Sequence, residues 1–313
     1  MKKASRLGIT AILIVTLLMS GVIAGCSNQV ASPNTQGNGE NTQQEGGFFA
    51  IKGSDSEVNV VQALVEGFAD VNEKAEFSVT GGGSGTGIAA LINKQTDIAN
   101  SSRPMSDAEV QQAKANGVEP VPIVFAFDGL AVLVNAGNPV ENLTVEQVGK
   151  IYAGEIKNWS EVGGEDKPIS LYGRQSNSGT YVFFRDTVVK GDYSADMQMM
   201  PGTSQIVEGV RQDVTGIGYA AIGYVKGASG IKAVNIAEKA GQPYISPLDD
   251  EKVFSGIYPL TRPLFQYLNG KPSGALKQFI EFELSDEGQA IVVKQGFLPV
   301  TPEYVQKNLK YLK

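Results

Sequence analysis

The chain has 313 residues, a formal net charge of −7 at pH 7, one cysteine and no histidine. Without histidine, neither a Ser-His-Asp triad nor a Cys-His pair can form, and the usual zinc ligand sets are excluded as well. An acidic chain is also a poor match for nucleic acid, whose phosphates require a basic face.

The first 25 residues have the features of a secretory signal peptide. Lys2, Lys3 and Arg6 precede an apolar run from Ile9 to Leu18, and small residues follow. This run is shorter than the roughly 20 residues that a membrane-spanning helix needs. We therefore favour a cleaved signal peptide, residues 1–25, over a permanent anchor helix.

Cys26 stands directly after Ile23-Ala24-Gly25 and resembles a lipobox cysteine, which would carry lipid such as palmitate on its sulfur. A two-chain lipid would hold the mature protein on the membrane surface. Ser27 to Gly47 contains hardly an apolar residue, so residues 26–47 are predicted to be the lipidated cysteine and a flexible linker. We expect an extracytoplasmic protein anchored to the cell membrane by lipid.

From residue 48 onward, short apolar runs of β type alternate with amphipathic segments, which is typical of an α/β protein. Six strands are predicted, over residues 48–52, 76–80, 98–101, 121–126, 130–135 and 169–172. The stripe formed by Val58, Val61, Leu64, Val65 and Phe68 predicts the first helix.

Serine and threonine mark the starts of the later helices. Capping-box spacing links Ser106 to Glu109 and Thr144 to Gln147. Other helices are predicted to begin after Ser178, Ser204, Ser273 and Ser285.

Two glycine-containing segments, Asp128-Gly129 and Ser255-Gly256, are candidate crossover points. If the chain crosses at both, residues 128–255 form one lobe and residues 48–127 plus 256–313 form the other. Two lobes joined by two crossover strands leave a ligand cleft between them, with a hinge able to close.

Three predicted strand-to-helix junctions share a chemistry that suits anions. They are Gly53-Ser54-Asp55-Ser56, Gly81 to Gly87, and Ser176-Asn177-Ser178-Gly179-Thr180. Glycine lets the backbone approach a ligand, and the first N–H groups of a helix lack partners and attract negative charge. Three such turns aimed at one point would make an anion cage.

The Gly81 to Gly87 loop does not fit a nucleotide motif. Ile88 stands where a P-loop has lysine, and the match to G-x-G-x-x-A is limited to Gly85, Gly87 and Ala90. A flexible turn without a ligand is the simple alternative.

Two arginines are candidate cations for the cage. Arg174 ends a predicted strand four residues before Ser178, and its planar guanidinium suits two anion oxygens at once. Arg103 follows another strand end. The alternative for an arginine is an ordinary surface salt bridge.

The chain resembles the phosphate-binding subunits of bacterial phosphate-specific ABC transporters over nearly all of residues 48–313. Besides the first two junctions, the resemblance rests on Asp97 to Arg103, Asp128 to Ala131, Tyr152 to Trp159, Arg174 to Thr180 and Gly216 to Tyr219. It implies a two-lobed periplasmic-binding-protein fold, type II-like, with phosphate in the cleft. The matching positions that would surround phosphate are Asp55, Ser56, Ser84, Ser102, Arg174, Ser178, Gly179 and Thr180. We interpret Trp159 as core packing.

The chain departs from the family pattern in two places. Many members have a carboxylate where Ser102 stands, and many have a threonine where Asp55 stands. The carboxylate matters because phosphate near neutral pH still carries a proton to donate, whereas sulfate does not, and a buried charge left unpaired costs several kcal/mol. Asp55 and Asp128 are equal candidates for this acceptor.

The sequence thus predicts a lipoprotein that carries out no covalent chemistry, captures inorganic phosphate and delivers it to the permease subunits of an ABC importer. We expect a monomer without cofactor or metal. A receptor for sulfate, molybdate or tungstate is the alternative with the same fold, and its site would contain donors only. A phosphatase would have to use carboxylates as bases or metal ligands. A scaffold lipoprotein would bind no anion tightly.

Overall fold

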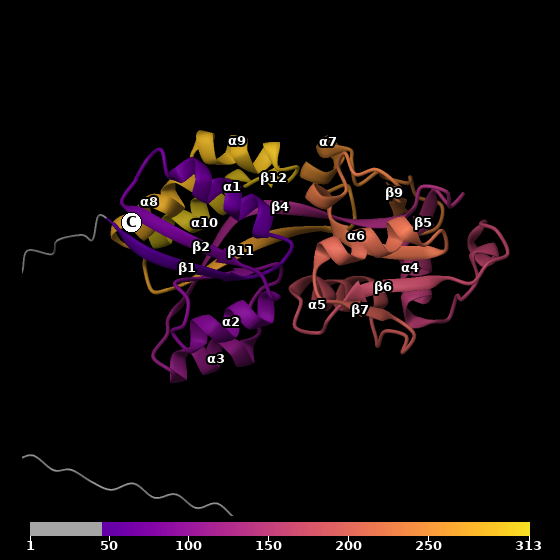
Figure 1. Ribbon diagram of the computed structural model, residues 1–313, viewed down its shortest axis with the longest axis horizontal. Coiled ribbons are helices and arrows are strands. Elements are labelled where there is room, and N and C mark those ends of the chain that lie inside the picture. Colours follow the sequence, from indigo (N-terminus) through magenta and orange to yellow (C-terminus); the bar gives the residue numbers. More distant parts are fainter. Residues whose placement is uncertain (1–45) are drawn as a thin grey trace, which may run out of the picture. The chain divides into compact units, whose positions relative to one another are not determined.

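The computed structural model describes residues 46–313. The predicted signal peptide, Cys26 and most of the predicted linker lie outside the described residues. Within residues 46–313, no helix is both long and apolar enough to span a membrane. Strands and helices alternate along the described chain, as predicted for an α/β protein (Figure 1).

Ten strands form one mixed sheet, and two short strands pair separately. The order along the main sheet is β2-β1-β3-β11-β4-β8-β6-β7, with β12 and β9 paired to β4. The strands of the main sheet are β1 (Gly47–Gly53), β2 (Ala75–Thr80), β3 (Ile98–Ser101), β4 (Pro120–Asn135), β6 (Ser170–Arg174), β7 (Gln198–Met200), β8 (Gly216–Ala221), β9 (Ile231–Ala233), β11 (Thr261–Asn269) and β12 (Leu298–Pro299). The separate pair is β5 (Asn142–Thr144) with β10 (Asn235–Ala237).

Strand β4 is continuous where two strands were predicted. Asp128 and Gly129 stay in the ladder opposite Arg262 and Thr261 of β11, so the predicted break between residues 126 and 130 is wrong. Asp128 is fully buried there and pairs with Arg262, which compensates for a charged residue inside a strand. The first half of β4 pairs with β11, and its second half pairs with β8 and β9.

The helices cover both faces of the sheet (Figure 1). They are α1 (Val58–Phe68), α2 (Ser84–Ile92), α3 (Asp107–Ala115), α4 (Val145–Ala153), α5 (Gly179–Phe184), α6 (Thr203–Gln212), α7 (Asp250–Phe254), α8 (Gly274–Glu283), α9 (Asp286–Lys294) and α10 (Pro302–Leu312). Around β1 and β2, helices α1, α8, α9 and α10 lie on one side, and α2 with α3 on the other (Figure 1).

Two large hydrophobic cores lie along the sheet. The first core combines residues 51–126 with residues 264–312, apart from Ala221. The second core is built from residues 130–260, apart from Leu298. Trp159 is only 2% exposed in the second core and donates its indole N–H to Thr215, so it packs as predicted. A smaller cluster fills the space between α2, α3 and the sheet.

Most of the predicted helix starts are confirmed. Ser106 and Thr144 form complete capping boxes, and Ser178 and Ser285 cap α5 and α9. Ser273 precedes α8 without a side-chain capping bond. The start after Ser204 is wrong, because α6 begins at Thr203 with Gly202 as its N-cap.

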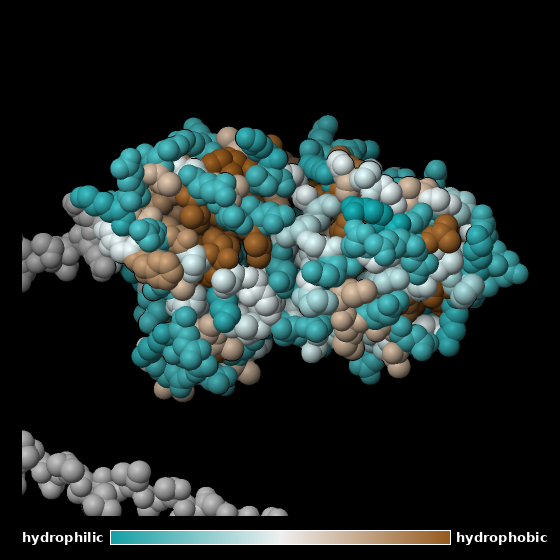
Figure 2. Space-filling view, in the orientation of Figure 1, coloured by the Kyte–Doolittle hydropathy of each residue, from teal (hydrophilic) through white to brown (hydrophobic). Residues whose placement is uncertain are grey.

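The surface differs between the edge of the sheet and its middle. On the face shown in Figure 2, hydrophobic residues gather over β1 and β2, where β1 carries the 67% exposed Phe48. Between the regions of α2 and α5, the same face is pale, which marks residues of intermediate hydropathy (Figure 2). On this face, the surface between α2 and α5 thus lacks a hydrophobic patch like the one over β1 and β2 (Figure 2).

Candidate functional site

The three glycine- and hydroxyl-rich junctions converge. Ser56 precedes α1 in the first core and Thr180 lies in the first turn of α5 in the second core, yet their hydroxyl oxygens are hydrogen-bonded at 2.9 Å. Both residues are buried. Gly179 packs against Ser84 so closely that a Cβ at residue 179 would collide with the serine side chain. The structure thus brings Ser56, Ser84, Gly179 and Thr180 to one buried place, as the sequence predicted.

Serines from the ends of β1 and β3 complete this side of the site. Ser102 donates its backbone N–H to Ser84 Oγ at 3.1 Å, and its own hydroxyl is hydrogen-bonded to Ser54. All three serines are buried. Hydroxyl groups can rotate to donate or accept, so this cluster can present donors to an anion without carrying charge itself.

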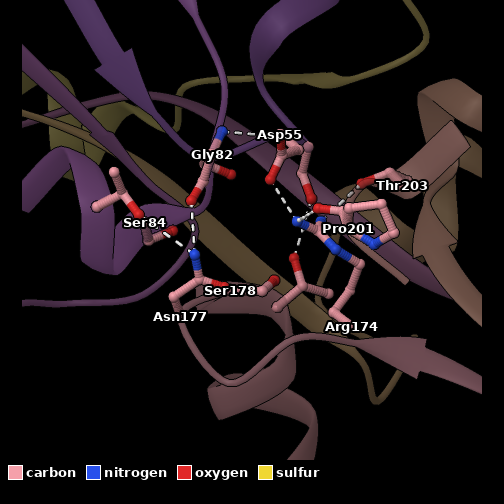
Figure 3. Close-up of polar contacts among 12 residues, drawn as sticks. Asp55, Gly82, Ser84, Arg174, Asn177, Ser178, Pro201 and Thr203 are labelled. Carbon is pink, nitrogen blue, oxygen red and sulfur yellow. Dashed lines mark hydrogen bonds and ion pairs between the residues drawn. The ribbon is translucent and has the colours of Figure 1, made fainter. Parts of the chain in front are cut away.

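Arg174 ends β6 and is buried, with an exposure of 1%. Nη1 donates to Thr203 Oγ1 at 3.1 Å, and Nη2 donates to Pro201 O at 3.0 Å. Nη2 also pairs with Asp55, and Asp55 Oδ1 accepts from the Gly82 N–H at 2.9 Å (Figure 3). Asp55 is therefore already held by a cation and a backbone donor from two different junctions.

Arg262 on β11 is a second buried cation that the sequence analysis did not select. Its Nε and Nη2 donate to Asp128 Oδ2 at 3.0 and 2.8 Å. Nη2 also donates to Thr180 Oγ1 at 3.1 Å, and Nη1 donates to Ser102 O at 3.3 Å. Arg262 thus joins Asp128 to the hydroxyl cluster. Burial raises the pKa of Asp128, an effect that Arg262 opposes.

Glu57 is a third buried carboxyl group that the sequence analysis also missed. It is the N-cap residue of α1, directly after Ser56, and is completely buried. Its Oε1 accepts from Ser102 Oγ at 3.0 Å, and its Oε2 has no hydrogen-bond partner among residues 46–313. Burial raises the pKa of Glu57 to about 8, although the Ser102 hydroxyl and Arg262 act in the opposite direction. Glu57 Oε2 is therefore a buried oxygen that remains available for a hydrogen bond to a ligand.

Behind Glu57 lies a cluster of buried polar side chains, Asn100, Gln266 and Glu283. Asn100 and Gln266 are opposite each other in the β3–β11 ladder, and Gln266 donates to Glu283 at 3.0 Å. Burial, with a smaller contribution from Glu57, raises the pKa of Glu283 well above its usual value. The raised pKa of Glu283 favours its neutral form, which reduces the negative charge behind the site.

Two predicted site residues have mainly local partners. Arg103 forms a bidentate pair with Glu109, with Nη–Oε distances of 2.8 and 2.7 Å, although its side chain lies close to Gly179. Ser178 caps α5, where its Oγ accepts from the Tyr181 N–H at 3.3 Å. Both residues stand at the edge of the cluster and keep donor capacity, because Arg103 Nε is buried without a hydrogen-bond partner among residues 46–313 and the Ser178 hydroxyl can still donate its hydrogen.

The arrangement is suited to holding a small anion. Each buried arginine is balanced by one aspartate, and the hydroxyl groups and first-turn N–H groups supply neutral donors. No cluster of acidic and cysteine side chains in residues 46–313 could hold a metal ion. The groups described here can bind an anion through hydrogen bonds, and Glu57 can act as an acceptor when it is ionised.

Glu57 and Arg262, which the sequence analysis did not select, differ in how far the sequence could have indicated them. Glu57 directly follows a selected junction, so its position was a usable signal, but a glutamate at a helix start usually only complements the helix dipole. Arg262 stands before Pro263 in a strand far along the chain, and no local pattern connects it to Asp128. Only the β4–β11 register places these two residues side by side.

Comparison with known proteins agrees with this geometry. Residues 30–287 match the family model described as the PBP superfamily domain. Over 284 residues the chain is 33% identical to the phosphate-binding protein PstS of Pseudomonas aeruginosa, covering 85% of this chain and 87% of that protein. PstS of Bacillus subtilis is 30% identical over 302 residues, covering 95% and 96%.

A solved structure has the same fold. It is a phosphate ABC transporter substrate-binding protein from Clostridium perfringens with bound phosphate, and it superposes with a TM-score of 0.73 at 29% sequence identity. The match covers 82% of this chain and 100% of that one. The chain therefore belongs to the PBP superfamily and, within it, to the family of the PstS phosphate-binding proteins.

Proposed function

We propose that this protein captures inorganic phosphate outside the cytoplasm and delivers it to the permease subunits of an ABC importer. One observation carries the proposal: buried hydroxyl groups from both cores meet beside Arg262, in the Ser56–Thr180–Arg262 contact. The names of the relatives and the phosphate in the structure from Clostridium perfringens support the same ligand.

Binding here means replacing the water around the anion. Each lost hydrogen bond to water has to be matched by a bond to the protein, because a buried charge without partners is costly. We assign as donors to the anion the hydroxyls of Ser56, Ser84, Ser102 and Thr180, together with N–H groups at the starts of α2 and α5. Arg174 and Arg262 supply positive charge, and the remaining hydrogen of Arg174 Nε has no partner among the described residues.

Selectivity for phosphate over sulfate would come from a carboxylate that accepts the ligand's proton. Asp55 and Asp128 were the candidates from the sequence, and both are engaged with arginine and with a backbone N–H. We assign this role to Glu57, because its Oε2 is buried without a partner among the described residues and its Oε1 accepts from Ser102, the position where the family resemblance implies a carboxylate in many members. Burial raises the pKa of Glu57 to about 8, and it accepts the ligand's proton in its ionised form; sulfate has no proton to offer this form and would be repelled by it.

The two cores correspond to the two lobes that we infer, residues 48–127 plus 256–313 and residues 128–255. Strands β4 and β11 are the connections between them. The contacts of Asp55 with Arg174 and of Ser56 with Thr180 join the two lobes, and such contacts would form when the lobes close around phosphate. Closure would then signal loading to the permease.

The N-terminal segment supplies the proposed attachment. Cleavage before Cys26 and lipidation of its sulfur would tether the body to the membrane surface through residues 27–47. The proposal includes a monomer with no enzymatic activity. A receptor for sulfate, molybdate or tungstate is the less favoured candidate, since the buried carboxyl of Glu57 does not fit a site of donors only.

Calorimetric titration of the protein with phosphate, sulfate and molybdate tests the proposal. Above pH 8, where Glu57 is ionised, we expect phosphate to bind at least about a thousandfold more tightly than sulfate, because an unpaired buried charge costs several kcal/mol. Equal affinity for sulfate would refute the assigned ligand. Turnover of an aryl phosphate would refute the absence of enzymatic activity.

A further inference from the structure

Asn177 connects the two cores outside the cluster of hydroxyls and arginines. Its side-chain Nδ2 donates to Gly82 O at 2.8 Å and to Thr86 Oγ1 at 3.2 Å, and its backbone O accepts from the Gly85 N–H at 2.9 Å (Figure 3). The loop between β6 and α5 is thereby fastened to the glycine-rich loop before α2 by three hydrogen bonds.

These contacts also explain two glycines that the sequence suggested for ligand approach. A Cβ on Gly83 would lie 2.8 Å from Asn177 O, and a Cβ on Gly85 would lie 3.1 Å from the same atom. Gly83 has φ 90°, which disfavours other residues in addition. The Gly83–Gly85 segment is therefore shaped to receive the Asn177 backbone, in addition to any approach to an anion.

Asn177 itself has no place in the anion cluster. It is an exposed residue, and its partners are Gly82, Gly85 and Thr86, whereas the buried hydroxyls and arginines have other partners. Its three bonds join segments of the two lobes that we infer. They can exist only while these two segments are together, so they favour the closed arrangement whether or not a ligand touches Asn177.

We propose that Asn177 is a latch that holds the two loops together over the bound anion and slows its release. The inference rests on the proposed function, because it concerns the closing of the same site. Phosphate enters and leaves through the open arrangement, so its release rate constant and apparent Kd depend on the ratio of open to closed ligand-bound protein. Loss of the latch raises this ratio, and with it the release rate constant and the apparent Kd, without removing any group that contacts phosphate.

The test measures phosphate affinity by calorimetry and phosphate release by stopped-flow displacement in the wild type and in Asn177→Ala. The free energy of two side-chain hydrogen bonds of ordinary strength corresponds to roughly a tenfold change in an equilibrium constant. We expect Kd and the release rate constant to rise by about this factor, with the association rate constant within twofold of the wild type.

Two further variants separate the hydrogen bonds from packing. Asn177→Asp keeps the size of the side chain but cannot donate to Gly82 O, so it should release phosphate at least as fast as Asn177→Ala. Thr86→Val keeps its shape and removes one acceptor, and it should give a smaller increase. Asn142→Ala serves as the matched control, because it removes an amide hydrogen bond to Asn235 in the separate β5–β10 pair.

The outcomes distinguish this inference from the proposed function. If the wild type does not bind phosphate, the proposed function is wrong. If the wild type binds phosphate and Asn177→Asp and Thr86→Val both release it at the wild-type rate, the latch is wrong. The latch is also wrong if the variants change only the association rate constant, or if Asn142→Ala has the same effect as Asn177→Ala.

Discussion

Replacing Glu57 with glutamine should make the ligand-free protein more resistant to a rise in pH. The pKa of Glu57 lies at about 8 in the folded chain against an ordinary value of 4.5. Between these two values the unfolded chain binds fewer protons at this position than the folded chain, so the stability that Glu57 contributes falls as pH rises. It is fully present below pH 4.5 and is lost as pH rises to about 8.

The size of the effect follows from the same two values. Each pH unit between these two pKa values lowers the unfolding free energy by about 1.4 kcal/mol. At pH 7, Glu57 therefore contributes about 3 kcal/mol less to the unfolding free energy than it does below pH 4.5. Glutamine has a similar shape and can accept from the Ser102 hydroxyl, but it does not titrate. The difference in unfolding free energy between Glu57→Gln and the wild type should therefore shift by about 3 kcal/mol in favour of the variant between pH 4 and 7.

Urea unfolding without phosphate, followed at pH 4, 5, 6 and 7, measures this shift. Glu73→Gln is the control for exchanging glutamate for glutamine at an exposed position, and the curve of unfolding free energy against pH for each variant is compared with that of the wild type. Parallel curves for Glu57→Gln would show that Glu57 is not a buried acid of raised pKa. In the same variant, the ratio of phosphate to sulfate affinity should fall at least about tenfold, because the acceptor for the ligand's proton is gone.

Four other substitutions test the charged groups of the site. Arg174→Ala should weaken phosphate binding by about 2 kcal/mol or more, through the loss of a charge-assisted pair, and unchanged titration heats would contradict this assignment. Arg262→Ala leaves Asp128 buried without its cation and should lower the unfolding free energy by about 3–5 kcal/mol, measured in urea. Asp55→Asn and Asp128→Asn should change the phosphate-to-sulfate affinity ratio less than Glu57→Gln does; a larger change in either would return the acceptor role to that aspartate.

Local patterns were sufficient for most elements and for half of the site. Apolar runs flanked by glycine and serine located β1, β2, β3 and β6, because each strand is short and ends in residues that favour turns. The capping boxes at Ser106 and Thr144 were readable for the same reason, since all of their partners lie within three residues. The hydroxyls of Ser56, Ser84 and Thr180 were found because each lies in a recognisable junction.

Features that depend on distant partners could not be read in this way. An aspartate followed by glycine is normally a turn signal, and it remains in strand β4 only because Arg262 lies opposite, 134 residues later. Glu57 resembles an ordinary helix-start acid until the buried Ser102 and the first core are placed around it. The pairing of Arg174 with Asp55, in place of a free guanidinium, likewise depends on two junctions 119 residues apart.

The residues that build the two cores decide which core can pack first during synthesis. The second core uses a continuous stretch within residues 130–260, whereas the first core needs residues from 51–126 together with α8, α9 and α10 at the C-terminus. During synthesis, the residues 130–260 that build the second core have therefore all been made before the first core has all of its residues. The earliest strands, β1 to β3, wait with their apolar faces unpacked until the last residues emerge, and a chaperone would have most to protect in this interval.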